Sequence, residues 1–206
     1  MKTFIELFSI ILTGNKDDSH KAAREVRKLL YNNSRDGGKY DDIKKIIEDA
    51  PDEYRKIKED WRRENFVIAV SVLYYLHDRE SQPDFLFPWL FHLLQHQNGN
   101  IRHAAVRMIE NELGPLTVHI RCPEYKQSRL KSEQSDSILL NLFKGLNNLL
   151  AVLWKPEYKK YKYVDSLPTC PYKSIQMVLG KMENDCGKEY MERLKSRFVL
   201  NKMKIV

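Results

Sequence analysis

The amino-acid sequence predicts an all-α protein. Apolar residues recur at the helical spacing of i, i+3, i+4 and i+7 in one segment after another. No segment contains a set of alternating apolar and polar stretches that pair into a sheet. The chain has 206 residues, of which 42% are hydrophobic, so it is long enough to bury the core of one domain or of a short repeat array without disulfides or metal ions.

Three helices are expected in the first fifty residues. Five apolar residues share one helical stripe over 4–12, and Gly14 ends that helix. Acidic and hydroxyl residues at 17–19 are suited to cap a second helix. A third helix is expected over 41–49, because Pro51 disfavours helical backbone at the residue before it.

Three or four further helices are expected in the middle of the chain. Residues 52–77 fit one long helix or two abutting ones, charged in the first half and apolar nearly all round in the second. Another helix is expected over 85–97, where Pro88 is tolerated only near the first turn. A further apolar stripe covers 101–112, and Gly114–Pro115 is expected to end that helix.

The rest of the chain is expected to be a connector followed by three helices. Residues 116–134 have no clear pattern and form the connector. Ser135 or Asp136 is suited to cap the strongest amphipathic pattern of the chain, in which six aliphatic residues stay in register up to Trp154. The chain then closes with a basic linker and two helices, expected over 155–172, 174–184 and 188–201.

Helix pairs recur along the chain, and the clearest pair lies at 88–106. Its first helix reads Pro-Trp-Leu-Phe-His-Leu-Leu, and its second begins Ile-Arg-His-Ala-Ala-Val. This pair resembles the HEAT repeat, whose first helix contains P-x-L-x-x-L-L and whose second opens with Val-Arg-x-Ala-Ala. Weaker copies lie at 4–24 and 65–70. The family often has an aspartate six residues before its signature arginine; here His96 takes that place, and His20 replaces the arginine in the first copy.

The resemblance implies an α-α superhelix, a HEAT-like solenoid of about four helix pairs that is degenerate towards the C-terminus. It implies HEAT-like helix pairs over 1–115, a connector over 116–134, and basic C-terminal helices over 135–206 packed on the same array. Small residues let neighbouring helices approach closely, so Ala105 is expected to be buried against an adjacent helix. An irregular helical bundle with chance Ala-Ala pairs is the alternative.

The net charge of +7 is concentrated in the last part of the chain. Residues 1–120 carry 18 Lys and Arg against 19 Asp and Glu, whereas residues 121–206 carry 17 against 9. Such a distribution favours an anionic partner, with lysine-rich solvated surfaces as the alternative. We therefore expect any affinity for anions to be electrostatic and to reside in the C-terminal third.

The segment most suggestive of binding interleaves lysine with tyrosine. Lysines neutralise phosphates while tyrosine rings stack on bases, a combination that single-stranded nucleic-acid grooves use. Alternatively, the rings pack the linker onto a neighbouring helix and the lysines are solvated. The candidate binding residues are Lys155, Tyr158, Lys159, Lys160, Tyr161, Lys162 and Tyr163.

No catalytic residue, metal or cofactor is predicted. The glycine-rich nucleotide-binding motifs and the nucleophile elbow are missing from the sequence. His92 and His96 lie one helical turn apart, but the sequence does not supply the further ligands that a metal site needs. HEAT-like alkylpurine DNA glycosylases pair an aspartate with aromatic side chains, and Asp60 beside Trp61 is the one candidate of that kind, with Trp89 and Trp154 also available.

These observations favour a non-enzymatic, HEAT-like module that binds another macromolecule, with an acidic protein preferred over nucleic acid. The alternative is a DNA-binding repair enzyme of the alkylpurine glycosylase type, acting through a basic concave face. Three cysteines without a C-x-x-C pair, at 122, 170 and 186, favour a reduced, cytoplasmic chain. No apolar stretch approaches the length of a membrane span, so no membrane partner is expected.

Overall fold

The computed structural model describes residues 2–33, 41–125 and 130–203, with side chains as far as Tyr31 in the first range and Phe198 in the last. These residues form helices and turns, with no β-strand among them. No helix in these ranges combines the length and apolar character needed to cross a lipid bilayer. The helices are α1 (Phe4–Thr13), α2 (Lys16–Asn33), α3 (Asp41–Glu48), α4 (Ala50–Lys56), α5 (Asp60–Leu73), α6 (Phe87–Leu94), α7 (Gly99–Leu116), α8 (Val118–Arg121), α9 (Ser132–Leu153), α10 (Pro171–Cys186) and α11 (Lys188–Met203), with short 3₁₀ helices η1 (Tyr74–Leu76), η2 (Pro156–Lys160) and η3 (Val164–Ser166).

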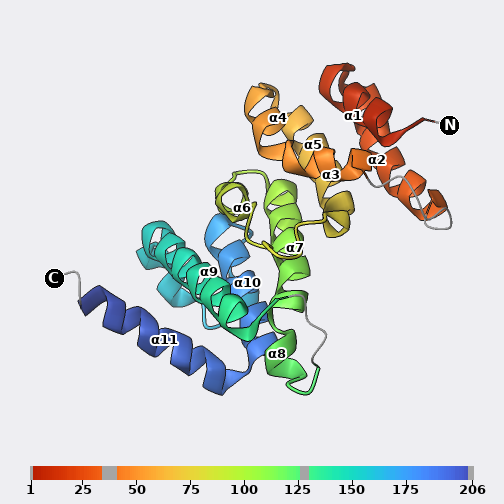
Figure 1. Cartoon of the computed structure of the whole chain (residues 1–206). Helices are drawn as coiled ribbons and strands as arrows, with labels where there is room; N and C mark the ends of the chain where they lie inside the picture. Colours follow the sequence, from red (N-terminus) through yellow and green to blue (C-terminus); the bar gives the residue numbers. More distant parts are fainter. Residues whose placement is uncertain (1, 34–40, 126–129, 204–206) are drawn as a thin grey trace.

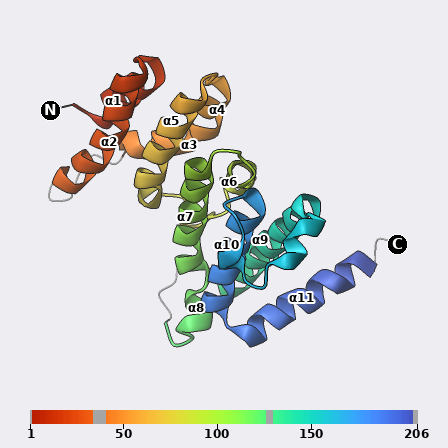
Figure 2. The ribbon, with the colours of Figure 1, turned by 180° about the vertical axis from the view of Figure 1, so that it is seen from behind.

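Helices α1 and α2 lie at one end of the molecule, α5 and α7 follow, and α10 lies between α7 and α9 (Figure 1). Helices α2, α5, α7 and α10 form a row in which each packs against the next. Helix α1 packs on α2, α3 and α4 pack on α5, α6 packs on α7, and α9 packs on α10. Helix α11 contacts α9 and α10 at the end of the molecule opposite α1, as the view from behind also shows (Figure 2).

The first helix forms where its apolar stripe predicts it. Thr3 Oγ1 accepts a hydrogen bond from the Glu6 N–H at 3.2 Å, and a Glu6 carboxylate oxygen accepts one from the Thr3 N–H at 2.7 Å. This capping box satisfies two backbone donors at the helix start. The stripe faces the core, because Phe4, Leu7 and Ile11 are all buried.

The segment 52–77 contains a break rather than one long helix. Ile57 ends α4 in an extended conformation, with ψ of 127°, and Glu59 is extended as well before α5 begins. The Ile57 side chain is buried, and its carbonyl accepts a hydrogen bond from Arg63 Nε at 2.9 Å. Burial of Ile57 and this bond therefore hold the chain in a sharp turn, so that α4 packs on α5 instead of continuing into it.

Helix α7 does not end at Gly114–Pro115, as the sequence predicts, but continues to Leu116 with Pro115 inside it. A proline inside a helix removes its own N–H and its ring crowds the carbonyl four residues earlier, and here the helix ends one residue after it. The turn is closed by Thr117, whose N–H and hydroxyl both donate to the Leu113 carbonyl, at 3.0 and 2.6 Å. The expected connector then begins with a short helix, α8.

Ser135 and Asp136 do not cap the long amphipathic helix, because α9 begins at Ser132. The Asp136 carboxylate instead accepts hydrogen bonds from His119 Nε2 in α8, at 2.9 Å, and from the Tyr190 hydroxyl in α11. This carboxylate therefore ties three helices together. A tertiary role of this kind leaves no local pattern in the sequence.

The alanine and arginine of the clearest repeat unit both lie in the core. Ala105 is fully buried in α7, as expected, and α7 packs against α5, α6 and α10. Arg102 is only 3% exposed, although it is charged. Its Nη1 donates to the His96 and Gln97 carbonyls, both at 2.7 Å, and its Nε donates to Ser174 Oγ at 3.2 Å. Arg102 thus joins the α6–α7 turn to α10.

Candidate functional site

A basic groove lies between α2 and α5, and we call it the α2–α5 groove. It encloses a cavity of about 470 Å³. One wall comes from the exposed face of α2 and the other from α5, so the groove joins segments about forty residues apart in the sequence. It is lined by His20, Ala23, Arg24, Arg27, Lys28, Asn65, Ile68 and Val72.

Among the described lining residues, every formal charge is positive and lies on α2. Arg24, Arg27 and Lys28 are exposed, and none of them makes an ion pair with any residue that the structure describes. Like charges spaced three and four residues apart on a helix destabilise it by about 0.2–0.5 kcal/mol per pair. The three cations thus lower the stability of α2, and a bound anion relieves that repulsion.

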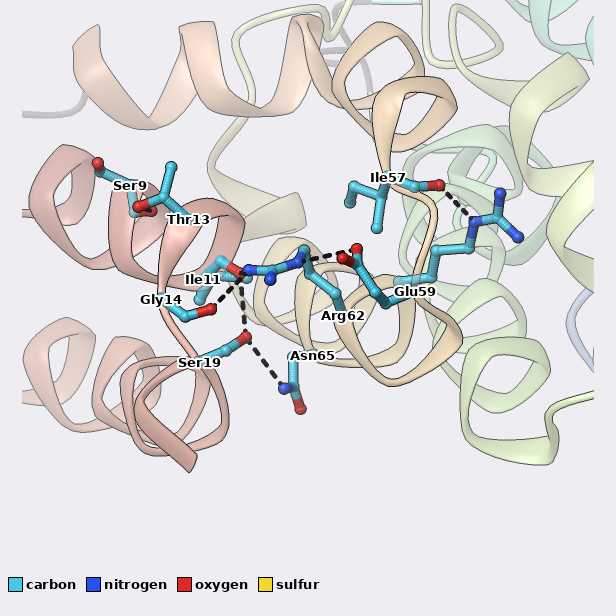
Figure 3. Close-up of polar contacts among 10 residues, drawn as sticks. Ser9, Ile11, Thr13, Gly14, Ser19, Ile57, Glu59, Arg62 and Asn65 are labelled. Carbon is cyan, nitrogen blue, oxygen red and sulfur yellow. Dashed lines mark hydrogen bonds and ion pairs between the residues drawn. The ribbon is translucent and has the colours of Figure 1, made fainter. Parts of the chain in front are cut away.

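A buried hydrogen-bond network holds α5 against α2 below the groove (Figure 3). Asn65 Nδ2 donates to Ser19 Oγ at 3.1 Å, and the Ser19 hydroxyl donates to the Ile11 carbonyl at 3.0 Å. Arg62 Nη1 donates to the same carbonyl at 3.0 Å and to the Gly14 carbonyl at 2.9 Å. These carbonyls belong to the last turn and the end of α1, which have no partner within the helix. The network therefore ties α1, α2 and α5 together.

The same network reaches the groove surface through Asn65. Its Oδ1 lies 3.3 Å from Nδ1 of His20, which places the imidazole at the start of the basic wall. The rest of the floor is apolar: Ala23 and Val72 are buried, and Ile68 is half-buried. Among the lining residues that the structure describes, the His20 imidazole is the only aromatic side chain. The groove therefore combines a basic wall with an apolar floor.

The Lys-Tyr segment that the sequence singles out lies after α9 and includes η2. Its lysines are exposed, but three of them lie over aromatic rings. The Nζ atoms of Lys159, Lys160 and Lys162 are 5.6, 5.1 and 5.3 Å from the ring centres of Trp154, Tyr161 and Tyr163, in that order. The cation–π contact with Lys159 places the Trp154 ring beside this segment.

The tyrosines of this segment divide into packed and exposed rings. Tyr158 is half-buried, and its ring centre lies 4.9 Å from that of Tyr172 in α10. Tyr161 is also half-buried, whereas Tyr163 is 65% exposed. Tyr158 therefore fits the packing alternative, and Tyr163 is the ring most available to a ligand.

The two histidines near the α6–α7 turn, His92 and His96, make different contacts. The His92 ring contacts Tyr54 at 6.1 Å between ring centres, while His96 Nδ1 accepts a hydrogen bond from the Asn98 N–H at 3.0 Å. Partial burial lowers the pKa of His96. Within the described ranges, no group of three or more metal-ligating side chains comes together.

Asp60, Trp61 and Trp89, considered for glycosylase chemistry, each contact a neighbouring side chain. The Asp60 carboxylate is exposed and lies 3.3 Å from Arg63 Nη1. The Trp61 ring is covered by the Arg62 guanidinium, 4.4 Å from the ring centre, and Trp89 is buried beside Tyr54. Asp60 and Trp61 therefore each contact a neighbouring arginine of α5.

A second polar cavity, of about 410 Å³, contains a pair that the sequence analysis did not identify. His77 Nδ1 accepts a hydrogen bond from the Arg79 N–H at 3.0 Å, so its Nε2 carries the proton and donates to Glu112 at 2.7 Å. Both side chains are largely buried. The pair ties the turn after η1 to α7.

Comparisons of this chain with family models, curated proteins and solved structures find no match.

The basic wall of the α2–α5 groove was not predicted from the sequence. Its signal is present, since 24, 27 and 28 share one helical face, but the acidic residues elsewhere in the first 120 positions cancel its charge in the sum.

Proposed function

We propose that this chain is a non-enzymatic, HEAT-like module that binds an acidic protein. Under this proposal, the helix pairs stack as a superhelical solenoid, and the row formed by α2, α5, α7 and α10 supplies the second helix of each unit. The serial packing of that row supports the stacking. Three cysteines without a disulfide support a reducing, cytoplasmic location.

The observation that carries the functional proposal is the α2–α5 groove. Its cations have no ion-pair partner among the described residues, and each is repelled by a like charge on α2. Helical-repeat arrays use extended surfaces of this kind to bind other macromolecules. An acidic protein fits the groove better than nucleic acid does, because the described residues that line it include no tyrosine, tryptophan or phenylalanine for base stacking.

Binding of labelled poly-L-glutamate to the pure chain tests this proposal. Fluorescence anisotropy at about 0.1 M salt, where the Debye length is about 10 Å, should give saturable binding that weakens as salt is added. The same preparation should release no base from alkylated DNA. Absence of polyglutamate binding overturns the proposal, and so does base release that the Asp60→Asn variant abolishes, because that result assigns a glycosylase activity.

A further inference from the structure

We infer that the α2–α5 groove is the docking site for an acidic amphipathic helix of the partner protein. The carboxylates of that helix face Arg24, Arg27 and Lys28, and its apolar side chains lie on Ile68 and Val72. The inference rests on the proposed function and names the partner element and the site where it binds.

The spacing of the basic wall matches the spacing of charges on a helix. From His20 to Lys28 the wall covers nine residues of α2, a rise of about 12 Å over eight steps of 1.5 Å. Arg24 and Lys28 are separated by one helical turn, with Arg27 on the same face. A partner helix that carries Glu or Asp at i, i+3 and i+4 repeats the same interval, so its carboxylates meet the three cations together.

The wall that α5 contributes to the groove carries no charge, and it specifies the other face of the partner helix. Asn65, Ile68 and Val72 lie at i, i+3 and i+7 along α5, and the half-buried Ile68 leaves apolar surface open to the groove. Leucine-sized side chains at helical spacing fill a cavity of this kind, as in other helix-in-groove complexes. A uniformly charged polymer lacks this apolar contact, so the groove favours an amphipathic helix over an extended polyanion.

The unfolding temperature of the free protein distinguishes a binding role of Arg27 from a purely structural one. Because Arg27 repels Arg24, replacement of Arg27 by glutamine removes a like-charge pair. The Arg27→Gln variant should therefore unfold at a slightly higher temperature than the native chain and still bind the acidic helix several-fold more weakly. A residue needed only for folding would lower the unfolding temperature.

The direct test uses a labelled helical peptide of about 18 residues with Glu and Leu on opposite faces. Anisotropy titrations compare the full chain with the Arg27→Glu and Arg197→Glu variants. Both replace an exposed arginine without an ion-pair partner in the described part of the chain, but Arg197 lies on α11 at the far end of the molecule. We expect about tenfold weaker binding for Arg27→Glu and less than twofold for Arg197→Glu.

A charge swap completes the test. The triple variant Arg24→Glu, Arg27→Glu, Lys28→Glu should lose the acidic peptide and bind the matching peptide with Lys in place of Glu more tightly than the native chain does. Circular dichroism checks that the variant remains helical.

Three results overturn the inference. The first is an equal loss of peptide binding in Arg27→Glu and Arg197→Glu. The second is failure of the native chain to bind the peptide while it still binds polyglutamate, which leaves the proposed function intact. The third is a single-stranded oligonucleotide that binds more tightly than the peptide and depends on the same three cations, which assigns the groove to nucleic acid.

Discussion

Replacement of Arg102 by methionine should destabilise the protein strongly, because this arginine is a buried link between three elements. Methionine keeps most of the aliphatic stem but removes two hydrogen bonds of 2.7 Å to carbonyls and one of 3.2 Å to Ser174. A hydrogen bond from a charged group contributes about 1.5–3 kcal/mol, and water can reach the partly exposed turn at His96 and Gln97. We therefore expect the free energy of unfolding to fall by about 3–5 kcal/mol.

Chemical denaturation followed by circular dichroism measures this loss. For a chain of this length the thermal midpoint should fall by roughly 6–20 °C. Arg107→Met is the matched control, because Arg107 is exposed on the same helix, and it should stay within about 0.5 kcal/mol of the native chain. Arg102→Lys should be intermediate, since an ammonium cannot reproduce the guanidinium fork. The reasoning is refuted if Arg102→Met and Arg107→Met are equally stable.

Four other predictions concern the core, a buried thiol and the Lys-Tyr segment. Ala105→Glu buries an unpaired charge and should cost several kcal/mol, so an unchanged thermal midpoint would contradict the packing of α7. Burial raises the pKa of Cys186 to about 12, so at about pH 8 a thiol reagent should label the exposed Cys122 well before Cys186. The free energy of unfolding should also fall from about pH 9 to about pH 12, because the unfolded chain loses a proton that the folded thiol retains. Glutamine at 159, 160 and 162 should lower the salt slope of any binding to a single-stranded oligonucleotide by about two to three, whereas an unchanged slope would remove these lysines from the contact.

The sequence alone determined most of the helices, because their signals are local. The stripe over residues 4–12 depends on neighbours within one or two turns, and it appears in the structure. The capping box at Thr3 is equally local, although the sequence analysis did not identify it. Burial of Ala105 was also predictable, since a small residue on an apolar helix face is suited to close packing. The break at Ile57 was left open, because two abutting helices and one long helix have the same periodicity.

Only the tertiary structure decided which distant polar groups meet. Arg62 satisfies the end of α1 from nearly fifty residues away, and Asp136 joins α8 to α11 instead of capping its own helix. The α2–α5 groove likewise forms only in the tertiary structure, because its basic wall comes from α2 and its uncharged wall comes from α5. Net charge summed along the chain hides the basic face of α2, because a sum does not distinguish charges on different faces, while the anion affinity expected in the C-terminal third stays a prediction. Hydrogen bonding and electrostatics depend on distances in space, and for residues far apart in the chain those distances are set by packing.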